Sequence, residues 1–375
     1  MFEQFEVPKS LMTSDPRFGV GPSLIPENHV HALANVSKSL LGTSHRKPAV
    51  RNLCKEVQDG LKKYFAVPDG YEVILGNGGA TLLFDMIALG LVKNKSLHYT
   101  MGEFSQKWFH AHKSVPWIDA EEISVEYGKG IKPAYKEGYD FICCTLNETS
   151  TGVMINSLPV VPAKNETDDV LISVDATSGA GQIPCDISKV DVYFFSPQKV
   201  FASDGGFFVC IMSPKALKRA KEISESDTYI PKTMSWDHAI SNSLKNQTYN
   251  TPAISTIFLL NEQVKLMNKL GEDKVVELAK RKAALLYDWA QSKEYLSCFV
   301  SEKDSRSISV ATIDVDDKYS VDDLEVMLAK NEVAYDIGSY RKLGRNQLRI
   351  STFHNISFED LEKLIQIISL AIENE

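Results

Sequence analysis

Apolar residues recur every three or four positions in several long segments of the chain. In residues 49–65 the apolar positions are Val50, Leu53, Cys54, Val57, Leu61, Tyr64 and Phe65. This spacing is typical of the buried face of an amphipathic helix. The same reasoning predicts further helices over residues 81–92, 253–270, 271–292, 320–331 and 357–374.

Short apolar runs with few charges separate the helices of the first two thirds of the chain. They are rich in Val, Ile, Phe and Tyr and occupy residues 71–75, 96–100, 139–145, 170–175, 192–196 and 206–212. Such runs are typical of strands that are buried on both faces of a sheet. Their alternation with helices predicts an α/β domain with a largely parallel sheet.

The pattern changes after residue 252, where two long helices precede a shorter module. That module alternates helices with predicted strands at residues 307–315, 332–337 and 347–352, which indicates a smaller α+β domain. A chain of 375 residues also suggests two domains, at about 150 residues per domain. We expect a large domain over residues 15–265 and a small domain made of residues 1–14 and 266–375.

Charge and composition exclude several classes of protein. The chain has 41 Lys and Arg against 49 Asp and Glu, a formal net charge of −8, which argues against a general nucleic-acid binder. No apolar run reaches the ~18 residues of a membrane helix, and the N-terminus lacks the features of a secretory signal. The six cysteines form no C-x-x-C pair, which favours reduced thiols in a cytoplasmic protein. We find no motif for a metal site.

Three segments at the ends of predicted strands carry candidate chemistry. Residues 76–81, Gly-Asn-Gly-Gly-Ala-Thr, form a turn into a helix whose free N–H groups can bind an anion, although a turn without a ligand is the alternative. Asp175 ends a strand, where α/β domains build sites, or it caps the next turn. Lys199 follows another strand, and burial there would lower its pKa and free the amine as a nucleophile; a solvated loop lysine is the alternative.

Taken together, the three segments favour one kind of site. A lysine, a carboxylate and a phosphate-binding turn are the parts that a pyridoxal phosphate site needs. A dinucleotide site on residues 76–81 is less favoured, because no acidic residue is placed to bind the ribose.

Longer blocks of sequence carry a resemblance across nearly the whole chain. They are GPSLIP (21–26), SHR (44–46), GNGGAT (76–81), GEFSQKW (102–108), NETSTG (147–152), VDATSGAG (174–181), SPQKVFASDGG (196–206), SLKNQTYNTPA (243–253) and YRKLGRNQLRIS (340–351). In these blocks the chain resembles the phosphoserine aminotransferases, class V members of the fold-type I pyridoxal phosphate enzymes, and in particular their actinobacterial branch. The resemblance implies a mostly parallel seven-stranded sheet in the large domain and a homodimer with shared active sites.

The resemblance also implies roles for residues around the cofactor, pyridoxal 5′-phosphate. Lys199 would form the Schiff base and move the proton, and Asp175 would pair with the pyridine nitrogen. The other implied cofactor contacts are Ala80, Thr81, Phe104, Thr149 and Gln198, with Asn250 and Thr251 from the partner subunit.

For the substrate, the resemblance implies that Arg349 binds the α-carboxylate. His45, Arg46 and Arg341 would line the site for the substrate's own phosphate. The chain departs from the family at four places: Phe104 replaces a common Trp, Ala80–Thr81 replace Gly-Arg, Val200 replaces Asn, and Tyr340 replaces a His. The last change bears on phosphate binding rather than on the cofactor.

The implied reaction interconverts 3-phosphohydroxypyruvate and L-glutamate with O-phospho-L-serine and 2-oxoglutarate, in L-serine biosynthesis. A related role in pyridoxine biosynthesis is implied by the resemblance alone. One alternative is a class V aminotransferase for an unphosphorylated substrate, such as a serine–glyoxylate enzyme. Another is a non-catalytic protein that binds pyridoxal phosphate, although Lys199 and Asp175 would then be unnecessary.

Overall fold

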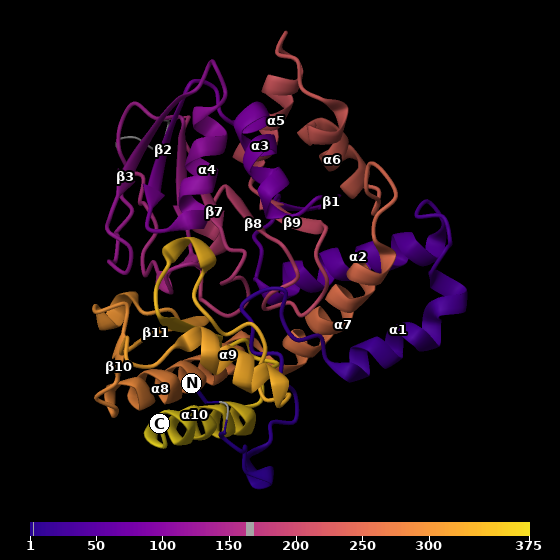
Figure 1. The fold of residues 1–375 in the computed structure, drawn as a ribbon. Coiled ribbons are helices and arrows are strands. Elements are labelled where there is room, and N and C mark those ends of the chain that lie inside the picture. Colours follow the sequence, from indigo (N-terminus) through magenta and orange to yellow (C-terminus); the bar gives the residue numbers. More distant parts are fainter. Residues whose placement is uncertain (3, 163–168) are drawn as a thin grey trace.

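The structure is a computed structural model that describes residues 1–2, 4–162 and 169–375. Its main feature is a seven-stranded sheet in the order β1-β9-β8-β7-β4-β2-β3 (Figure 1). The strands are β1 (Glu72–Asn77), β2 (Lys95–Thr100), β3 (Asp119–Ser124), β4 (Phe141–Thr145), β7 (Leu171–Asp175), β8 (Val192–Phe195) and β9 (Phe207–Met212). Strand β9 runs antiparallel to β1 and to β8, and the other pairs in this sheet are parallel. The predicted α/β fold with a mostly parallel sheet is therefore confirmed.

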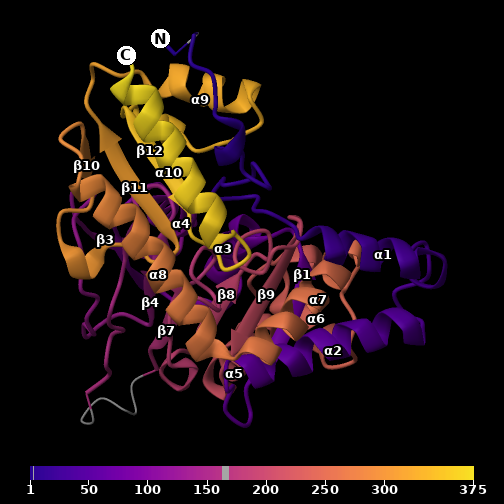
Figure 2. The same ribbon diagram turned by 90° about the horizontal axis from the view of Figure 1, so that it is seen from below.

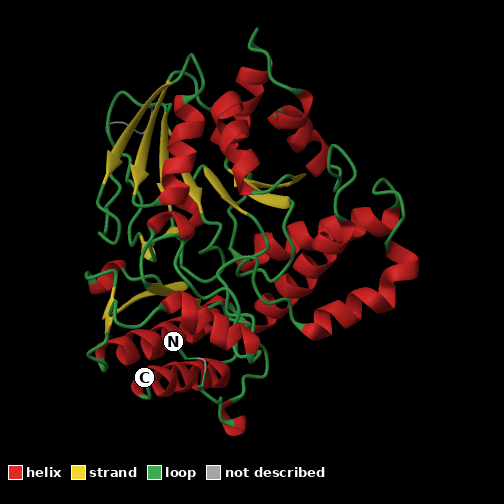
Figure 3. Ribbon diagram, viewed as in Figure 1, coloured by secondary structure: helices red, strands yellow, loops and turns green. Residues whose placement is uncertain are grey.

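Helices cover both faces of this sheet, as the unbroken apolar strands require. One face carries α2 (Pro48–Tyr64) and α7 (Ile254–Leu270), with α1 (Glu27–Leu40) packed on α7. The other face carries α3 (Ala80–Leu91), α4 (Glu103–Lys113), α5 (Pro214–Ser224) and α6 (Trp236–Ser243). Figure 3 shows β1 and β9 lying between these two sets of helices, and α4 lying against the strands at the other end of the sheet.

A second, three-stranded antiparallel sheet belongs to the C-terminal part of the chain. Its strands are β10 (Leu296–Cys298), β11 (Val310–Val315) and β12 (Gln347–Ser351), and its helices are α8 (Glu272–Gln291), α9 (Val321–Lys330) and α10 (Phe358–Glu373). Figure 2 shows α8 and α10 side by side along this sheet. The apolar core of this unit includes Phe2 and Phe18 from the N-terminal segment. This core supports a small domain built from both ends of the chain, and its limits at residues 14 and 266 stay a prediction.

One predicted strand is absent from the structure, and one observed strand was not predicted. The strand predicted over residues 332–337 is wrong: Glu332 and Asp336 have φ of 55° and 54°, which an extended strand excludes, and only Tyr335 makes an isolated bridge, to Arg17. Strand β3 was not predicted, because its sequence Asp-Ala-Glu-Glu-Ile-Ser is charged. Charged residues are tolerated there because β3 lies at the edge of the sheet.

A short hairpin links the two units. Its strands are β5 (Asn147–Glu148) and β6 (Val153–Met154), and Val153 bridges to Arg306 of the C-terminal unit. Across the described residues, we find no helix with the length and apolar character needed to span a bilayer.

Candidate active site

A cavity of about 270 Å³ opens at the carboxyl ends of the central parallel strands. Parallel strands end at one edge of a sheet, so the residues that follow them meet there. Seven of the residues predicted for a cofactor site line this cavity: Ala80, Thr81, Phe104, Thr149, Asp175, Gln198 and Lys199. We call it the lysine cavity.

Lys199 lies in the turn after β8 and is buried, with 8% of its surface exposed. Its Nζ atom donates a hydrogen bond to the carbonyl oxygen of Val20 at 2.8 Å and lies 5.8 Å from the centre of the Phe104 ring. Burial lowers the pKa of Lys199 to about 8, helped by the nearby charge of Arg349 and opposed by Asp175 and Glu148. The amine is therefore easier to deprotonate than an exposed lysine.

Asp175 is the last residue of β7 and is also buried. Burial raises its pKa to about 6, although the backbone N–H and the hydroxyl of Thr177 donate to its Oδ1 at 2.9 and 2.6 Å and oppose that rise. Above about pH 6 the cavity thus contains a buried carboxylate. A buried carboxylate favours a cation or an N–H donor beside it, so Asp175 would stabilise the protonated form of a ligand group in the cavity.

The glycine-rich turn after β1 forms the start of α3. Gly79 has a φ of 83°, a conformation that favours glycine, and α3 begins at Ala80. The backbone N–H of Ala80 donates to Ser196 Oγ at 2.6 Å. The turn therefore presents a helix N-terminus to the lysine cavity, which is a suitable place for a phosphate group.

An aromatic and cationic wall packs against Phe104, which lines the lysine cavity. The Phe104 ring lies 5.6 Å from the Tyr340 ring, and the Lys107 ammonium lies 4.8 Å from the centre of Phe104. Lys107 donates to the Tyr340 hydroxyl at 3.2 Å. The Arg349 guanidinium lies 5.4 Å from the centre of the Tyr340 ring, so two cations lie near this ring.

Arg349 reaches this wall from β12, and its Nη1 donates to the Thr149 carbonyl at 3.4 Å. Its Nε is buried without a hydrogen-bond partner among the described residues. Burial lowers the pKa of Arg349, although a guanidinium remains charged in proteins. An arginine with unused donors is suited to bind a carboxylate.

The lysine cavity fits pyridoxal phosphate on the evidence of its own polar atoms. Asn147 Oδ1 and Gln198 Oε1 are buried and have no partner among the described residues, although both side chains line the cavity. Buried polar atoms normally have a hydrogen-bond partner, so a bound polar ligand would supply the hydrogen bonds that these two atoms lack. Lys199, Asp175 and the start of α3 match the aldehyde, the pyridine nitrogen and the phosphate of that cofactor.

The remaining predicted residues lie outside the lysine cavity of this chain. Asn250 and Thr251 are exposed, and Asn77 Nδ2 donates to both of their carbonyl oxygens, at 3.3 and 3.1 Å. The Thr251 hydroxyl lies 3.2 Å from Nδ1 of the buried His45, whose Nε2 has no partner within the described chain. Arg46 and Arg341 are exposed.

Several residues in and around the lysine cavity were not singled out from the sequence. Ser196 accepts a hydrogen bond from the backbone of Ala80, and Thr177 donates one to Asp175. Ser178 accepts hydrogen bonds at 2.8 Å from Thr149 Oγ1 and Asn147 Nδ2. Each belongs to a block that carried the resemblance, which is the signal that could have identified it. A Ser or Thr after a strand otherwise suggests only a turn.

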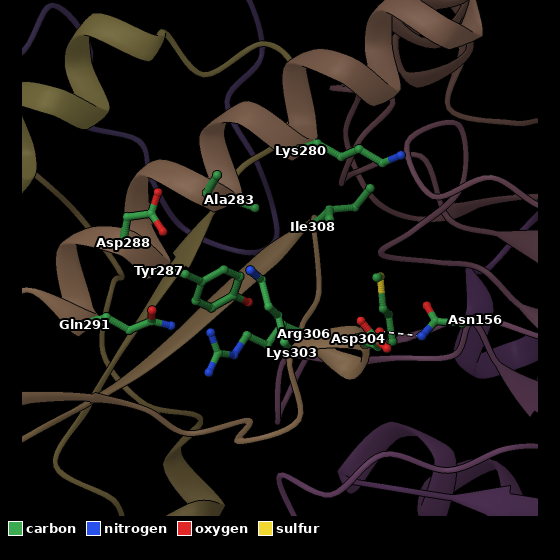
Figure 4. Close-up of a pocket in the computed structure, with 12 residues that line it drawn as sticks. Asn156, Lys280, Ala283, Tyr287, Asp288, Gln291, Lys303, Asp304, Arg306 and Ile308 are labelled. Carbon is green, nitrogen blue, oxygen red and sulfur yellow. Dashed lines mark hydrogen bonds between the residues drawn. The ribbon is translucent and has the colours of Figure 1, made fainter.

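A second cavity, of about 600 Å³, lies between α8 and the segment before β11. Figure 4 shows the Tyr287 ring of α8 facing Arg306, whose guanidinium lies 5.4 Å from the ring centre. Lys280 and Asp288 line this cavity and are exposed. We call it the α8 cavity.

One buried group of metal-ligating residue types lies under α4. Atoms of His98, His112 and Cys143 lie within 4.8 Å of one another. Both nitrogens of His112 have partners, at 3.1 Å from Trp108 Nε1 and 3.1 Å from Ser96 Oγ. Ser96 Oγ also lies 3.2 Å from His98 Nε2. These contacts describe a hydrogen-bonded network in the core, so we assign it no metal.

Comparison with known proteins gives a consistent result. A model of the Aminotransferase class-V family matches residues 18–364. The phosphoserine aminotransferase of Nocardioides sp. is 44% identical over 377 residues, covering 100% of both chains. A solved phosphoserine aminotransferase from Cytophaga hutchinsonii superposes with a TM-score of 0.86 at 26% identity, covering 96% of this chain and 99% of that one. A phosphoserine aminotransferase from Trichomonas vaginalis, solved with its cofactor bound, has a similar fold, with a TM-score of 0.82, 20% identity and coverage of 95% and 99%.

Proposed function

This chain belongs to the class-V aminotransferase family, and from that premise we propose that it acts as a phosphoserine aminotransferase. The proposed reaction interconverts 3-phosphohydroxypyruvate and L-glutamate with O-phospho-L-serine and 2-oxoglutarate, as in L-serine biosynthesis. The observation that carries the proposal is the convergence of Lys199, Asp175 and the start of α3 on one buried cavity.

When bound, pyridoxal phosphate supplies an electron sink that weakens the Cα–H bond of the amino acid attached to it. Lys199 Nζ would take the proton from Cα and deliver it to the C4′ carbon of the cofactor. With a pKa of about 8, about a tenth of this amine is neutral at pH 7, against far less than 1% for an exposed lysine. Asp175 is ionised above about pH 6 and would keep a proton on the pyridine nitrogen of the bound cofactor.

Recognition of substrate depends on the cations around the cavity. We assign Arg349 to the α-carboxylate, because its Nη1 donates to the carbonyl of Thr149, which lines the cavity, and its buried Nε has no partner among the described residues. The substrate's phosphate would be bound by His45, Arg46 and Arg341. The same cations can bind the γ-carboxylate of glutamate, which allows one site to serve both substrates.

The exposed positions of Asn250, Thr251, Arg46 and Arg341 support a homodimer with shared sites. Thr251 contacts the buried His45, so these two residues lie together outside the lysine cavity of their own chain. In the proposed dimer, Asn250 and Thr251 reach the cofactor phosphate of the partner subunit.

The six cysteines are free thiols, which supports a reducing compartment, the cytoplasm.

The proposed substrate is tested by comparing Arg46→Ala with Lys47→Ala, which removes a neighbouring exposed charge. Loss of a cation that pairs with phosphate is expected to raise the KM for O-phosphoserine by ~30-fold or more. Lys47→Ala should leave that KM within about twofold of the unmodified protein. An unchanged KM in Arg46→Ala would remove Arg46 from the phosphate site.

A direct comparison of amino donors separates the alternatives. O-phosphoserine should be a far better donor to 2-oxoglutarate than L-serine or L-alanine. Preference for L-serine with glyoxylate as acceptor would instead indicate a class V enzyme for unphosphorylated substrates. Protein that binds the cofactor but transfers no amino group from any donor would indicate a binding protein.

A further inference from the structure

Glu148 is a buried carboxylate without a cationic partner among the described residues. It is the second residue of β5, and none of its surface is exposed. An ionised carboxylate in the protein interior is unfavourable unless hydrogen bonds compensate it. The partners of Glu148 therefore indicate what it does.

Its hydrogen-bond partners are donors from two segments, the start of α4 and the turn that follows Glu148 itself. Oε1 accepts from the backbone N–H of Phe104 at 3.2 Å and from the N–H and hydroxyl of Ser150 at 3.2 and 2.7 Å. Oε2 accepts from the backbone N–H of Ser105 at 2.9 Å, and the Ser105 hydroxyl also lies at 2.9 Å. Two of these donors are free N–H groups in the first turn of α4.

The carboxylate thus takes the place of a residue that normally caps a helix. The residue before α4 is Gly102, which has no side chain to accept these N–H groups. A Cβ atom at Gly102 would lie 2.4 Å from Glu148 Cγ and 2.6 Å from its Cδ. Glycine here leaves room for the carboxylate, whose charge also complements the positive end of the helix dipole.

This contact joins two parts of the wall of the lysine cavity. Phe104 donates its backbone N–H to Glu148, and its ring lines the cavity. Thr149 follows Glu148 directly and lines the cavity from the hairpin. The negative charge also raises the pKa of Lys199 and of Asp175, so it acts within electrostatic range of both.

We propose that Glu148 is a positioning residue that fixes the N-terminus of α4 and thereby holds the Phe104 ring against the bound cofactor. This inference rests on the proposed function for the identity of the cofactor. It does not depend on which amino acid is the substrate.

The test is a double-mutant cycle between Glu148→Gln and Phe104→Leu. The amide of Glu148→Gln keeps the volume but turns an N–H group toward N–H donors. We expect the affinity for pyridoxal phosphate to fall by about tenfold or more, with a weaker visible circular dichroism band of the bound cofactor. Phe104→Leu should weaken the same two readouts, and the double variant should be little worse than either single variant.

Glu122→Gln is the matched control, because Glu122 also accepts from a hydroxyl, that of Thr100 at 2.9 Å, but lies on β3 away from the cavity. It should leave cofactor affinity and circular dichroism unchanged. Ser105→Ala is a milder variant that removes one hydroxyl and retains the backbone donor, in case Glu148→Gln does not fold; it should move both readouts in the same direction by a smaller amount.

Additive effects in the cycle, or a Glu148→Gln protein with unmodified cofactor affinity and spectrum, would overturn the inference. Both readouts are measured without amino substrate. A protein that shows the predicted cycle but does not use O-phosphoserine would contradict the proposed function and leave the role of Glu148 intact.

Discussion

The lysine cavity is smaller than the α8 cavity, yet it is the one in which charged residues are buried. The α8 cavity is the larger, at about 600 against 270 Å³, yet its Lys280 and Asp288 are exposed. The lysine cavity encloses Lys199 and Asp175, and burial moves the pKa of the first down to about 8 and of the second up to about 6. The burial of charged groups at converging strand ends, rather than the volume of a cavity, is therefore what marks the candidate active site.

The two cavities also use their arginines differently. Arg306 in the α8 cavity donates through Nε to the Val300 carbonyl at 2.8 Å and stacks on Tyr287. Arg349 beside the lysine cavity has a buried Nε with no partner among the described residues. The first arginine stabilises its own loop, and the second has donors left for a substrate.

The largest expected effect separates the two lysines. Lys199→Ala removes both the attachment of the cofactor and the base, so we expect activity to fall by more than ~10⁴-fold. Lys280→Ala changes an exposed residue of the α8 cavity and should retain full activity. Steady-state rates with O-phosphoserine and 2-oxoglutarate measure both. Substantial activity in Lys199→Ala would contradict the assignment of the catalytic lysine.

Next in size is the contrast between the two aspartates. Asp175→Asn removes the charge opposite the pyridine nitrogen and should lower kcat by ~10²–10³-fold, whereas Asp288→Asn should have no effect on kcat. If both variants behaved alike, burial at the strand end would not be the feature that matters.

Asp175→Asn should also stabilise the protein without cofactor. The folded-state pKa of about 6 lies above the ordinary value of 3.8, so stability that is fully present below about pH 4 is lost as pH rises through 6. Removing the charge should therefore raise the free energy of unfolding at pH 8 by up to about 3 kcal/mol. Thermal unfolding at pH 4 and pH 8 measures this, and an advantage that is larger at pH 4 would contradict it.

The two arginines should give a smaller difference. Arg349→Ala should lower kcat/KM for O-phosphoserine by ~30–1000-fold, because the α-carboxylate of the substrate loses its buried cationic partner. Arg306→Ala should leave kcat/KM unchanged and lower stability by about 1 kcal/mol through its lost hydrogen bond. A large kinetic effect of Arg306→Ala would show that the α8 cavity takes part in the reaction.

The smallest effect is the pH dependence of cofactor capture by the cofactor-free protein. Because the neutral amine of Lys199 reacts, the capture rate should rise about tenfold between pH 7 and pH 9 and then level off, as a pKa of about 8 requires. Stopped-flow absorbance follows the capture. A rate that is still rising at pH 10 would indicate an ordinary, solvated lysine.

The sequence predicted those features that depend on local pattern. The buried strands β4, β7, β8 and β9 are continuous apolar runs, so their ends and the positions of Asp175 and Lys199 followed directly. Strand β3 could not be found that way, because an edge strand carries charges.

Contacts between distant segments were beyond the sequence. Glu148 lies 43 residues from Ser105, and a Glu after a strand gives no sign that it caps another helix. His45 and Thr251 meet across 206 positions. The proposed contact of Thr251 with the cofactor of a second subunit came from the family resemblance, because no periodic pattern within one chain records it.

The most direct test of the central claim is the visible absorption of purified protein, loaded with pyridoxal phosphate and titrated with O-phospho-L-serine. The yellow band of the lysine-bound cofactor should give way to the band of pyridoxamine phosphate, and 2-oxoglutarate should restore it. A yellow protein whose spectrum ignores O-phosphoserine would contradict the proposed substrate, and a protein that takes up no cofactor at all would contradict the whole account of the lysine cavity.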